Sequence, residues 1–289
     1  MINLKAYAKL NLFLNITGKL DNGYHTLEMV MQSIDLFDSV SIEKTDGFCV
    51  VCEGIDMLHN SAYRAGLAFF QKAGILPSAK ISISKRIPVM AGLGGGSADA
   101  AAAILGLNEL YQKPLSYCDM QKIAKGIGAD VPFALKGGCA VARGIGEILE
   151  PVSNNMECCY LIIKPIQGCN TALCYSKYDE KPIKSEKDAL INTIKSIENG
   201  NIEDFAQSTF NALTVSAVDI CPSIASVLTV MKAQTGCLCA FMTGSGSACV
   251  CIFENLQSAQ KAKKNALLQI EGAFACICKN VSSGIEITN

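Results

Sequence analysis

Four glycines in five positions, directly ahead of an alanine-rich stretch, are the feature of this sequence that most strongly indicates chemistry. In AGLGGGSADAAAA they are Gly92, Gly94, Gly95 and Gly96, followed by Ser97. Without a Cβ, successive glycines let several backbone N–H groups point into one concavity. A helix that begins directly after them adds unpaired N–H groups and the positive end of its dipole. The loop therefore predicts an anion site, and phosphate is the usual occupant of such sites.

Two better-known phosphate loops do not fit this sequence. A Walker loop needs a lysine after its glycines, and none follows here. The dinucleotide fingerprint G-x-G-x-x-G, started at Gly92, would need glycine where Ser97 stands. A flexible strand-to-helix connection, with Ser97 as its N-cap, stays open as the alternative on the loop alone. For Asp99 we weigh a favourable charge at the helix start against a Mg²⁺ contact through water, and we favour the first.

The overall composition restricts the class of protein. The chain has 289 residues, 50% of them hydrophobic, and its 25 Lys and Arg balance 26 Asp and Glu. Near-neutrality gives no global attraction to nucleic acid or to an anionic membrane, so we expect neither as a partner. Lys5 and Lys9 interrupt the apolar start, so we expect no secretory leader, no membrane span and a cytoplasmic protein. We expect no obligate protein partner either.

The 15 cysteines suggest metal or disulfide chemistry, but their spacing argues against it. Only Cys49 and Cys52 form a C-x-x-C, and no second pair completes a zinc site. The C-x-C pairs lie in strand-like segments, where residues two apart share one face as core residues do. In a reducing cytoplasm we expect these cysteines to behave as small hydrophobes.

Strands and helices alternate in both halves of the chain, which predicts two domains of mixed α and β structure. A composition change at residues 151–155 divides them into residues 1–154 and 155–289. The patterns predict strands at 11–16, 26–37, 39–44, 48–53, 80–85, 137–143, 146–151, 158–164, 239–242, 248–253, 274–278 and 284–288. They predict helices at 60–73, 98–110, 116–126, 187–197, 204–211, 223–234 and 258–268.

Three segments together resemble the GHMP kinases, a superfamily of small-molecule kinases with neither a Walker loop nor the protein-kinase fold. AYAKLNLFLNI resembles its N-terminal motif, IPVMAGLGGGSADAAA its phosphate-binding motif and FMTGSGSACVCIF its C-terminal glycine motif. They stand in the expected order and span the chain. The resemblance implies a two-domain fold of α+β or α/β class, with an S5-like N-terminal domain, a ferredoxin-like C-terminal domain and an active site in the cleft between them.

Further segments resemble one branch of that superfamily, namely AKLNLFL, GYHTLEMVMQSIDLFD and GADVPFAL. The branch implies transfer of the ATP γ-phosphate to the 2-hydroxyl of a diphosphocytidyl-linked methylerythritol, a step toward isoprenoid precursors, with Mg²⁺ as cofactor. The nearest alternative is a GHMP kinase with a homoserine or mevalonate acceptor, and the next is a nucleotide-binding module without catalysis. GYHT favours the diphosphocytidyl branch, because small acceptors offer no base on which a tyrosine can stack.

Transfer to an alcohol needs a group near the hydroxyl proton and positive charge near the phosphoryl oxygens. By the resemblance, Asp130 of GADVPFAL is the base and Lys9 of AKLN is its partner. A neighbouring lysine lowers the pKa of a carboxyl group and keeps it ionised. Taken singly, Asp130 would be interpreted as a helix N-cap and Lys9 as a solvated strand lysine.

The resemblance also assigns binding residues for both substrates. For ATP it implies Gly92, Gly94, Gly95, Gly96 and Ser97 at the phosphates, with Lys85, Asn60 and Met90 near the base. For the acceptor it implies His25 at the cytosine edge, Tyr24 and Tyr175 stacked on the base, and Asn11, Thr171, Gly244, Ser245 and Gly246 as further contacts. Ser97 is the expected Mg²⁺ contact, since no glutamate can be assigned to the metal. His59 matches no functional position, and we expect it at the surface.

Overall fold

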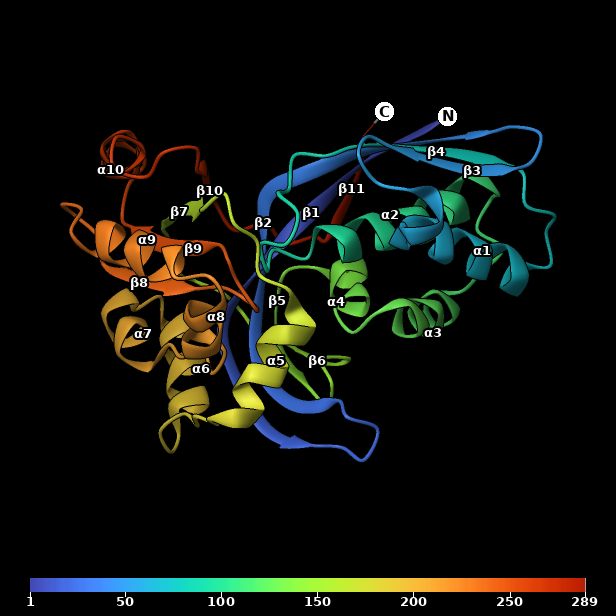
Figure 1. The fold of residues 1–289 in the computed structure, drawn as a ribbon. Coiled ribbons are helices and arrows are strands. Elements are labelled where there is room, and N and C mark those ends of the chain that lie inside the picture. Colours follow the sequence, from blue (N-terminus) through green and yellow to red (C-terminus); the bar gives the residue numbers. More distant parts are fainter. Residues whose placement is uncertain (289) are drawn as a thin grey trace.

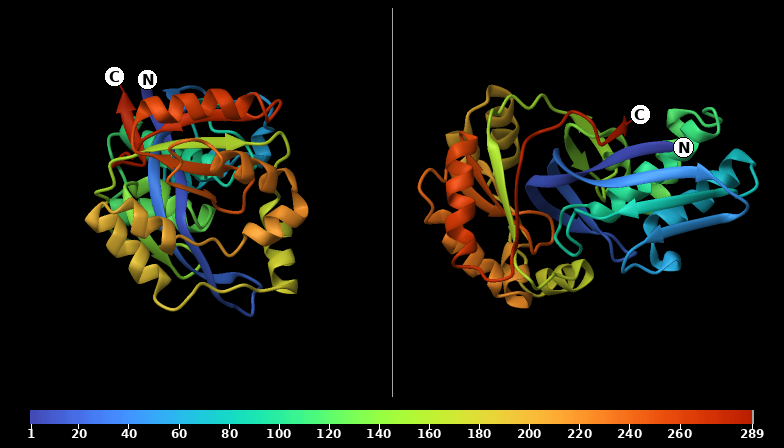
Figure 2. Two further views of the ribbon diagram at one scale, coloured as in Figure 1. Left: turned by 90° about the vertical axis from the view of Figure 1, so that its left-hand side faces the viewer. Right: turned by 90° about the horizontal axis from the view of Figure 1, so that it is seen from above.

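Two β-sheets, each with helices packed on it, make up the computed structural model (Figure 1), which describes residues 1–288. Residue 289, the last of the expected second domain, lies outside the described part. The first sheet has seven strands and the second has four. Figure 2 shows the two units side by side, with the second sheet and its helices stacked against one end of the first.

The first sheet is built around a long hairpin of β1 (Ile2–Lys19) and β2 (His25–Lys44). The predicted turn joins them, and Gly23 takes the left-handed φ of 85° that this turn requires. Register shifts along the hairpin bend it, and residues 39–44 are the second half of β2 rather than the separate strand that the sequence predicts. A bulge lets one strand change direction without ending.

The remaining strands of this sheet come from several parts of the chain. They are β3 (Phe48–Cys52), β4 (Ala79–Ser84), β5 (Cys139–Arg143), β6 (Ile148–Pro151) and β11 (Ile285–Thr288). The order is β11-β1-β2-β4-β3, with β5 paired to the other half of β2 and β6 to β5. The last strand, β11, therefore returns from the second half of the chain and pairs with β1. The domain boundary at residue 154 stays a prediction.

Four helices cover one face of the first sheet (Figure 1): α1 (Ser61–Ala73), α2 (Gly95–Leu110), α3 (Tyr117–Ile127) and α4 (Val131–Lys136). A short 3₁₀ turn, Met57–His59, precedes α1. The alanines of α2 are buried, and their small side chains let this helix lie close to β1 and β2. At Gly106 an added Cβ would lie 2.5 Å from Ile42 Cδ1, so the closest approach needs glycine. This packing fixes the start of α2 above the sheet.

The start of α2 differs from the prediction. Gly94, in a left-handed conformation with φ of 72°, occupies the N-cap position, and the helix begins at Gly95. Ser97 lies inside the first turn and is not the N-cap, because the glycines themselves adopt the helical path. The cap predicted for α3 is confirmed, since Ser116 accepts a hydrogen bond from the backbone N–H of Asp119.

The second sheet has the antiparallel order β10-β7-β9-β8, formed by β7 (Cys159–Lys164), β8 (Cys239–Met242), β9 (Cys249–Phe253) and β10 (Phe274–Cys278). In chain order, α9 (Ser223–Lys232) comes between β7 and β8, and α10 (Leu256–Leu267) comes between β9 and β10. This is the split β-α-β arrangement of a ferredoxin-like domain. Between β7 and α9 stand α5 (Thr171–Glu180), α6 (Ala189–Asn199), α7 (Ile202–Ser208) and α8 (Thr214–Ile220). The sequence patterns missed α5 and α8.

Most of the cysteines are buried or partly buried, and Cys118 is exposed. All 15 are free, and Cys249, Cys251 and Cys278 are buried in the second sheet. Within residues 1–288 no group of three or more His, Cys, Asp or Glu side chains is placed to hold a metal ion. No helix in the same part of the chain is long and apolar enough to cross a membrane.

Candidate active site

A cavity of about 1000 Å³ lies between the two units. Its walls come from β1, the β1–β2 turn, the glycine loop before α2, the start of α4, the helix α5 and the turn between β8 and β9. Every site residue expected from the sequence lines it, except Asn60 and Gly246. Segments as far apart in the chain as β1 and the β8–β9 turn thus contribute to one cleft.

The glycine loop supplies backbone donors to this cleft. Gly92 and Gly94 have φ of 74° and 72°, which side-chain-bearing residues rarely adopt. An added Cβ at Gly94 would lie 2.9 Å from Lys9 Cγ, so glycine here also makes room for the lysine below the loop. The N–H groups of Gly95 and Gly96 belong to the first turn of α2 and have no partner within the helix. Together with the helix dipole they suit an anion.

The second glycine turn, Gly244–Gly246, packs directly on the first loop. An added Cβ at Gly92 would lie 2.3 Å from the carbonyl oxygen of Thr243, and one at Gly244 would lie 2.7 Å from that of Gly92. The backbone N–H of Ala248 donates to the Ala91 carbonyl at 3.1 Å. Gly246 is inside this contact, close to Met242 and Ile224, so it supports the turn from behind rather than lining the cleft.

Lys9 and Asp130 meet at the floor of the cleft. The lysine Nζ lies 3.3 Å from Asp130 Oδ2 and also donates to Asn11 Oδ1. Lys9 is buried, unlike a solvated strand lysine, and its backbone N–H donates to the Leu93 carbonyl of the glycine loop. Asp130 occupies the N-cap position of α4, but its side chain makes no capping hydrogen bond. Its side chain is 29% exposed and faces the cleft.

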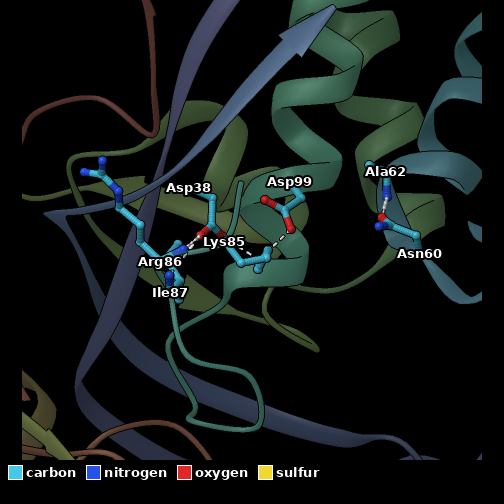
Figure 3. Close-up of polar contacts among 7 residues, drawn as sticks. All are labelled: Asp38, Asn60, Ala62, Lys85, Arg86, Ile87 and Asp99. Carbon is cyan, nitrogen blue, oxygen red and sulfur yellow. Dashed lines mark hydrogen bonds and ion pairs between the residues drawn. The ribbon is translucent and has the colours of Figure 1, made fainter. Parts of the chain in front are cut away.

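Lys85 has a different electrostatic setting, drawn in Figure 3. Its Nζ contacts Asp38 at 2.5 Å and Asp99 at 2.6 Å. Asp38 also accepts from the backbone N–H groups of Arg86 and Ile87. Burial raises the pKa of Asp99 to about 7, and its second oxygen has no hydrogen-bond partner among residues 1–288. Burial lowers the pKa of Lys85, but the two carboxylates outweigh this and hold it above its usual value.

Asn60 and Met90 flank the part of the cleft near the glycine loop. Asn60 is buried as the N-cap of α1, and its side-chain oxygen accepts from the N–H of Ala62 at 2.9 Å (Figure 3). It does not line the cleft, whereas Ser61 beside it does. Met90 lines the cleft with a φ of 53°, and its carbonyl accepts from the N–H of Cys169.

The other end of the cleft is aromatic. The ring of His25 stacks on Tyr175, with centroids 4.9 Å apart and planes at 27°. Burial and the nearby Asp130 raise the pKa of Tyr175 well above its usual value, so its hydroxyl is neutral. Tyr24, on the hairpin turn, lines the cleft but is 60% exposed, and it contacts neither ring face of this pair in the described residues. His59 is at the surface, as expected.

Asn11 of the first unit and Thr171 and Ser245 of the second unit line the cleft with polar groups. Thr171 Oγ1 and Ser245 Oγ are 2.8 Å apart, and the backbone N–H of Asn11 donates to Thr243 Oγ1. These polar groups lie between the glycine loop and the aromatic end, since Gly244 packs on Gly92 and Thr171 is one helical turn before Tyr175. The arrangement places an anion-binding loop, a carboxylate held by a lysine, and a row of hydroxyl and aromatic groups in one cavity.

Two charged residues of the cleft, Lys19 and Asp179, are missed by the sequence motifs. Asp179 Oδ1 lies 2.7 Å from His25 Nε2, and Lys19 Nζ lies 2.6 Å from Asp179 Oδ2. The hydrogen bond from Lys19, and to a smaller extent that from His25, lowers the pKa of Asp179. The available signal was the spacing of Tyr175, Tyr178 and Asp179, which puts all three on one side of a helix.

Comparison with known proteins identifies the family. Residues 60–138 match the family described as GHMP kinases N terminal domain, and residues 193–267 match GHMP kinases C terminal. A 4-diphosphocytidyl-2-C-methyl-D-erythritol kinase from Desulfitobacterium hafniense is 39% identical over 268 residues, covering 92% of this chain and 91% of that protein. The chain belongs to the 4-diphosphocytidyl-2-C-methyl-D-erythritol kinase family. It is an ATP-dependent small-molecule kinase, as the sequence motifs predict.

Further relatives agree with the family and the fold. A 4-diphosphocytidyl-2-C-methyl-D-erythritol kinase from Acetivibrio thermocellus is 39% identical over 278 residues, covering 94% of each chain. A crystal structure of 4-(cytidine 5'-diphospho)-2C-methyl-D-erythritol kinase has a TM-score of 0.78 at 29% identity, covering 96% of this kinase and 98% of that chain. A homoserine kinase from Cytophaga hutchinsonii has a TM-score of 0.79 at 15% identity, covering 99% of this kinase and 97% of that chain. The last likeness is one of fold alone, and the predicted two-domain GHMP kinase fold is confirmed.

Proposed function

We propose that this kinase transfers the γ-phosphate of ATP to the 2-hydroxyl of 4-diphosphocytidyl-2-C-methyl-D-erythritol in the cytoplasm. The observation that carries the proposal is the single cleft that holds the glycine loop at one end, the Lys9–Asp130 pair in the middle and the His25–Tyr175 stack at the other. A substrate with a reactive hydroxyl between a phosphate donor and a nucleobase matches that order. Its partners are these small molecules, without nucleic acid.

In the transfer step, Asp130 orients the acceptor hydroxyl and takes its proton as the oxygen attacks phosphorus. The new O–P bond forms while the bond to the leaving ADP oxygen breaks, with charge spread over the equatorial phosphoryl oxygens. Lys9 holds the carboxylate and adds positive charge next to these oxygens. The neutral Tyr175 hydroxyl near Asp130 does not compete for the proton.

For ATP, the N–H groups of Gly94, Gly95, Gly96 and Ser97 are the proposed phosphate ligands, in the geometry of a helix N-terminus. Gly92 shapes the loop against the second glycine turn. Lys85 and Met90 are proposed next to the rest of the nucleotide, since both line the cleft near this loop. Asn60 is proposed to act indirectly, because it caps the start of α1 and so fixes the position of Ser61, which lines the cleft.

Mg²⁺ is the proposed cofactor, and the residues present fit an ion held mainly by phosphates and water. Mg²⁺ usually keeps several waters and binds through one or two protein oxygens plus substrate phosphates. The Ser97 hydroxyl lines the cleft in the first turn of α2 and is the proposed protein ligand. Asp99 does not line the cleft and faces Lys85 instead. When bound, the ion would neutralise charge on the phosphates.

For the acceptor, Tyr24, Tyr175 and His25 are the proposed contacts of the cytosine. Asn11, Thr171, Gly244 and Ser245 are the proposed contacts of the methylerythritol and its phosphates, with Gly246 behind them. Stacking contributes about 1–3 kcal/mol per base in single-stranded nucleic-acid sites, which is a guide to the tyrosines here. The polar groups lie between this aromatic end and the glycine loop, as a bridging substrate requires.

An ATP-consumption assay tests the proposal with three acceptors: the diphosphocytidyl compound, homoserine and mevalonate. We expect turnover with the first and background rates with the other two. A higher kcat/KM for homoserine or mevalonate would assign another acceptor. Binding of ATP without consumption in the presence of any acceptor would instead favour a non-catalytic nucleotide-binding module.

A further inference from the structure

The contact between His25 and Asp179 carries a consequence for the choice of nucleobase. Asp179 is in the last turn of α5, while His25 begins β2, so the pair joins the two units at the aromatic end of the cleft. Asp179 uses one oxygen for His25 Nε2 and the other for Lys19 Nζ, at 2.7 Å and 2.6 Å. The mechanism proposed above uses neither Lys19 nor Asp179.

The His25 ring has little freedom to turn. Its side chain is only 8% exposed, Tyr175 stacks on one face and Tyr178 meets it edge-on, with centroids 6.2 Å apart and planes at 86°. Rotation out of its plane would break both aromatic contacts, and a half-turn within the plane would lose the hydrogen bond to Asp179. The two ring nitrogens therefore keep different neighbours.

The position of the proton on the ring follows from Asp179. An ionised carboxylate only accepts hydrogen bonds, and the lysine beside it keeps Asp179 ionised. Nε2 must then carry the hydrogen, and in a neutral imidazole this leaves Nδ1 as an acceptor. Within residues 1–288 Nδ1 has no hydrogen-bond partner, and it is not one of the fully buried unpaired atoms, so solvent reaches it. His25 lines the cleft, and Nδ1 is therefore the ring nitrogen left for a ligand.

A hydrogen-bond acceptor at Nδ1 of His25 discriminates between the two pyrimidine bases. Cytosine carries an amino group, a donor, at the position where uracil carries a carbonyl oxygen, an acceptor. We propose that Asp179, held by Lys19, is a positioning residue that fixes His25 as the Nε2–H tautomer and thereby selects a cytidine over a uridine diphosphate acceptor. This inference rests on the proposed function, since it concerns the base of that same acceptor.

Asp179→Asn gives the sharpest test, because an amide has one oxygen and one NH₂ group. Lys19 takes the oxygen, so the NH₂ group faces Nε2 and reverses the tautomer, which makes Nδ1–H a donor. We expect wild-type kcat/KM to favour the cytidine over the uridine form of the acceptor by about tenfold or more, since the mismatched pair leaves a buried group unsatisfied. In Asp179→Asn the ratio should fall by about tenfold or more, with an unchanged KM for ATP.

Two further variants separate positioning from general damage. Glu180→Gln removes a charge from the same helix end, but Glu180 pairs with the exposed Lys177 and not with His25, so its cytidine-to-uridine ratio should equal that of wild type. Asp179→Ala removes the partner without supplying a donor, so its ratio should fall without favouring uridine. If Asp179→Asn lowers both rates and keeps the wild-type ratio, Asp179 is only structural and the proposal is wrong.

Nitrogen chemical shifts of histidine-labelled protein read the tautomer without any substrate. The chain has only two histidines, so the exposed His59 is an internal reference. Wild type should show a protonated Nε2 and an unprotonated Nδ1 at His25, and Asp179→Asn the reverse. The opposite wild-type result would overturn the inference even when the cytidine acceptor is phosphorylated. A wild-type enzyme that phosphorylates neither acceptor would contradict the proposed function and leave this spectroscopic test intact.

Discussion

Two lysines line the same cleft in opposite electrostatic settings. Lys9 lies 3.3 Å from one carboxylate, Asp130, which is partly open to the cleft. Lys85 contacts two carboxylates, Asp38 and Asp99, which are both buried. The backbone N–H groups of Arg86 and Ile87 use the second oxygen of Asp38, while Asp130 makes no capping bond and keeps an accessible face. A carboxylate can take a proton from a substrate only where such a face remains.

The Lys9–Asp130 pair is therefore suited to catalysis, and the Lys85–Asp38–Asp99 cluster is suited to stabilising the fold. Buried ion pairs are costly to break, because the remaining charge is left without water or a partner. Partly exposed pairs contribute little to stability but leave their groups available to a ligand. Substitution of Lys9 or Asp130 should therefore act mainly on turnover. Substitution of Lys85 should act mainly on unfolding, in addition to its proposed contact with the nucleotide.

The largest expected effect is that of Asp130→Asn on turnover. Loss of a general base lowers kcat by about 10²–10⁴-fold. The KM for ATP should stay within about twofold, since Asp130 is not in the glycine loop. The unfolding temperature should change less than for a fully buried pair, because Asp130 is partly exposed and Lys9 keeps its hydrogen bond to Asn11. Steady-state kinetics with a thermal melt check both. Turnover close to that of wild type would remove Asp130 from the role of base.

Lys85→Met should have the largest effect on stability. The change leaves Asp38 and Asp99 buried without their shared cation, which costs about 3–5 kcal/mol of unfolding free energy. For a chain of this size the unfolding temperature should fall by about 10 °C. Asp130→Asn, melted under the same conditions, is the matched control. If the two variants melt together, the buried cluster is not the stronger structural element.

Lys9→Met should lower kcat by about a hundredfold, at the lower end of the loss for one charge-stabilising group. The reason for a smaller loss than with Asp130→Asn is that the base itself remains. Single-turnover measurements separate this loss from changes in substrate binding. Equal losses in Lys9→Met and the double variant with Asp130→Asn would show that the two residues act as one unit.

A more gradual effect is a pH dependence of stability that originates at Asp99. Its pKa is raised to about 7 in the folded protein, so the folded state holds a proton that the unfolded chain has already lost above pH 4–5. Unfolding free energy from this group must then fall as pH rises from about 5 to 7, by up to about 1.4 kcal/mol per pH unit. Denaturant unfolding of wild type and Asp99→Asn should diverge in slope over this range. If unfolding free energy changes with pH in the same way in both proteins, Asp99 is not the source of the pH dependence.

Much of the fold follows from local patterns in the sequence. The turn at Asp21–Gly23, the helix after Asn60 and the cap at Ser116 are correct, because each depends on residues adjacent in the chain. The single strand made of 26–37 and 39–44 is not readable in this way, since residues 37–39 are held in continuous pairing with β1 and the register shift falls at Asp35 and Leu36. The return of β11 to β1 depends on contacts almost the whole chain apart.

The site shows the same division. The glycine loop is readable because its chemistry is local, although Ser97 as N-cap is wrong, since the left-handed Gly94 starts the helix earlier. Asp179 is missed because the pattern of α5 is weak, with only Cys174 and Tyr178 buried in ten residues. Asp99 as a charge at the start of the helix is wrong, because α2 begins at Gly95 and Asp99 pairs with Lys85 beyond the first turn. The contact of Lys85 with Asp38 is missed because only the pairing of β2 with β4 brings the two residues together. The individual site residues remain predictions to be tested by substitution.

The contact between the two glycine turns has a mechanical consequence. Backbone hydrogen bonds join Ala91 to Ala248, and Gly92 lies against Thr243 with no space for a side chain. Because these contacts involve backbone atoms, substitution of the side chains that line the cleft leaves them in place. The two turns, far apart in the chain, therefore form one wall of the cleft, and a shift of either turn is passed directly to the other.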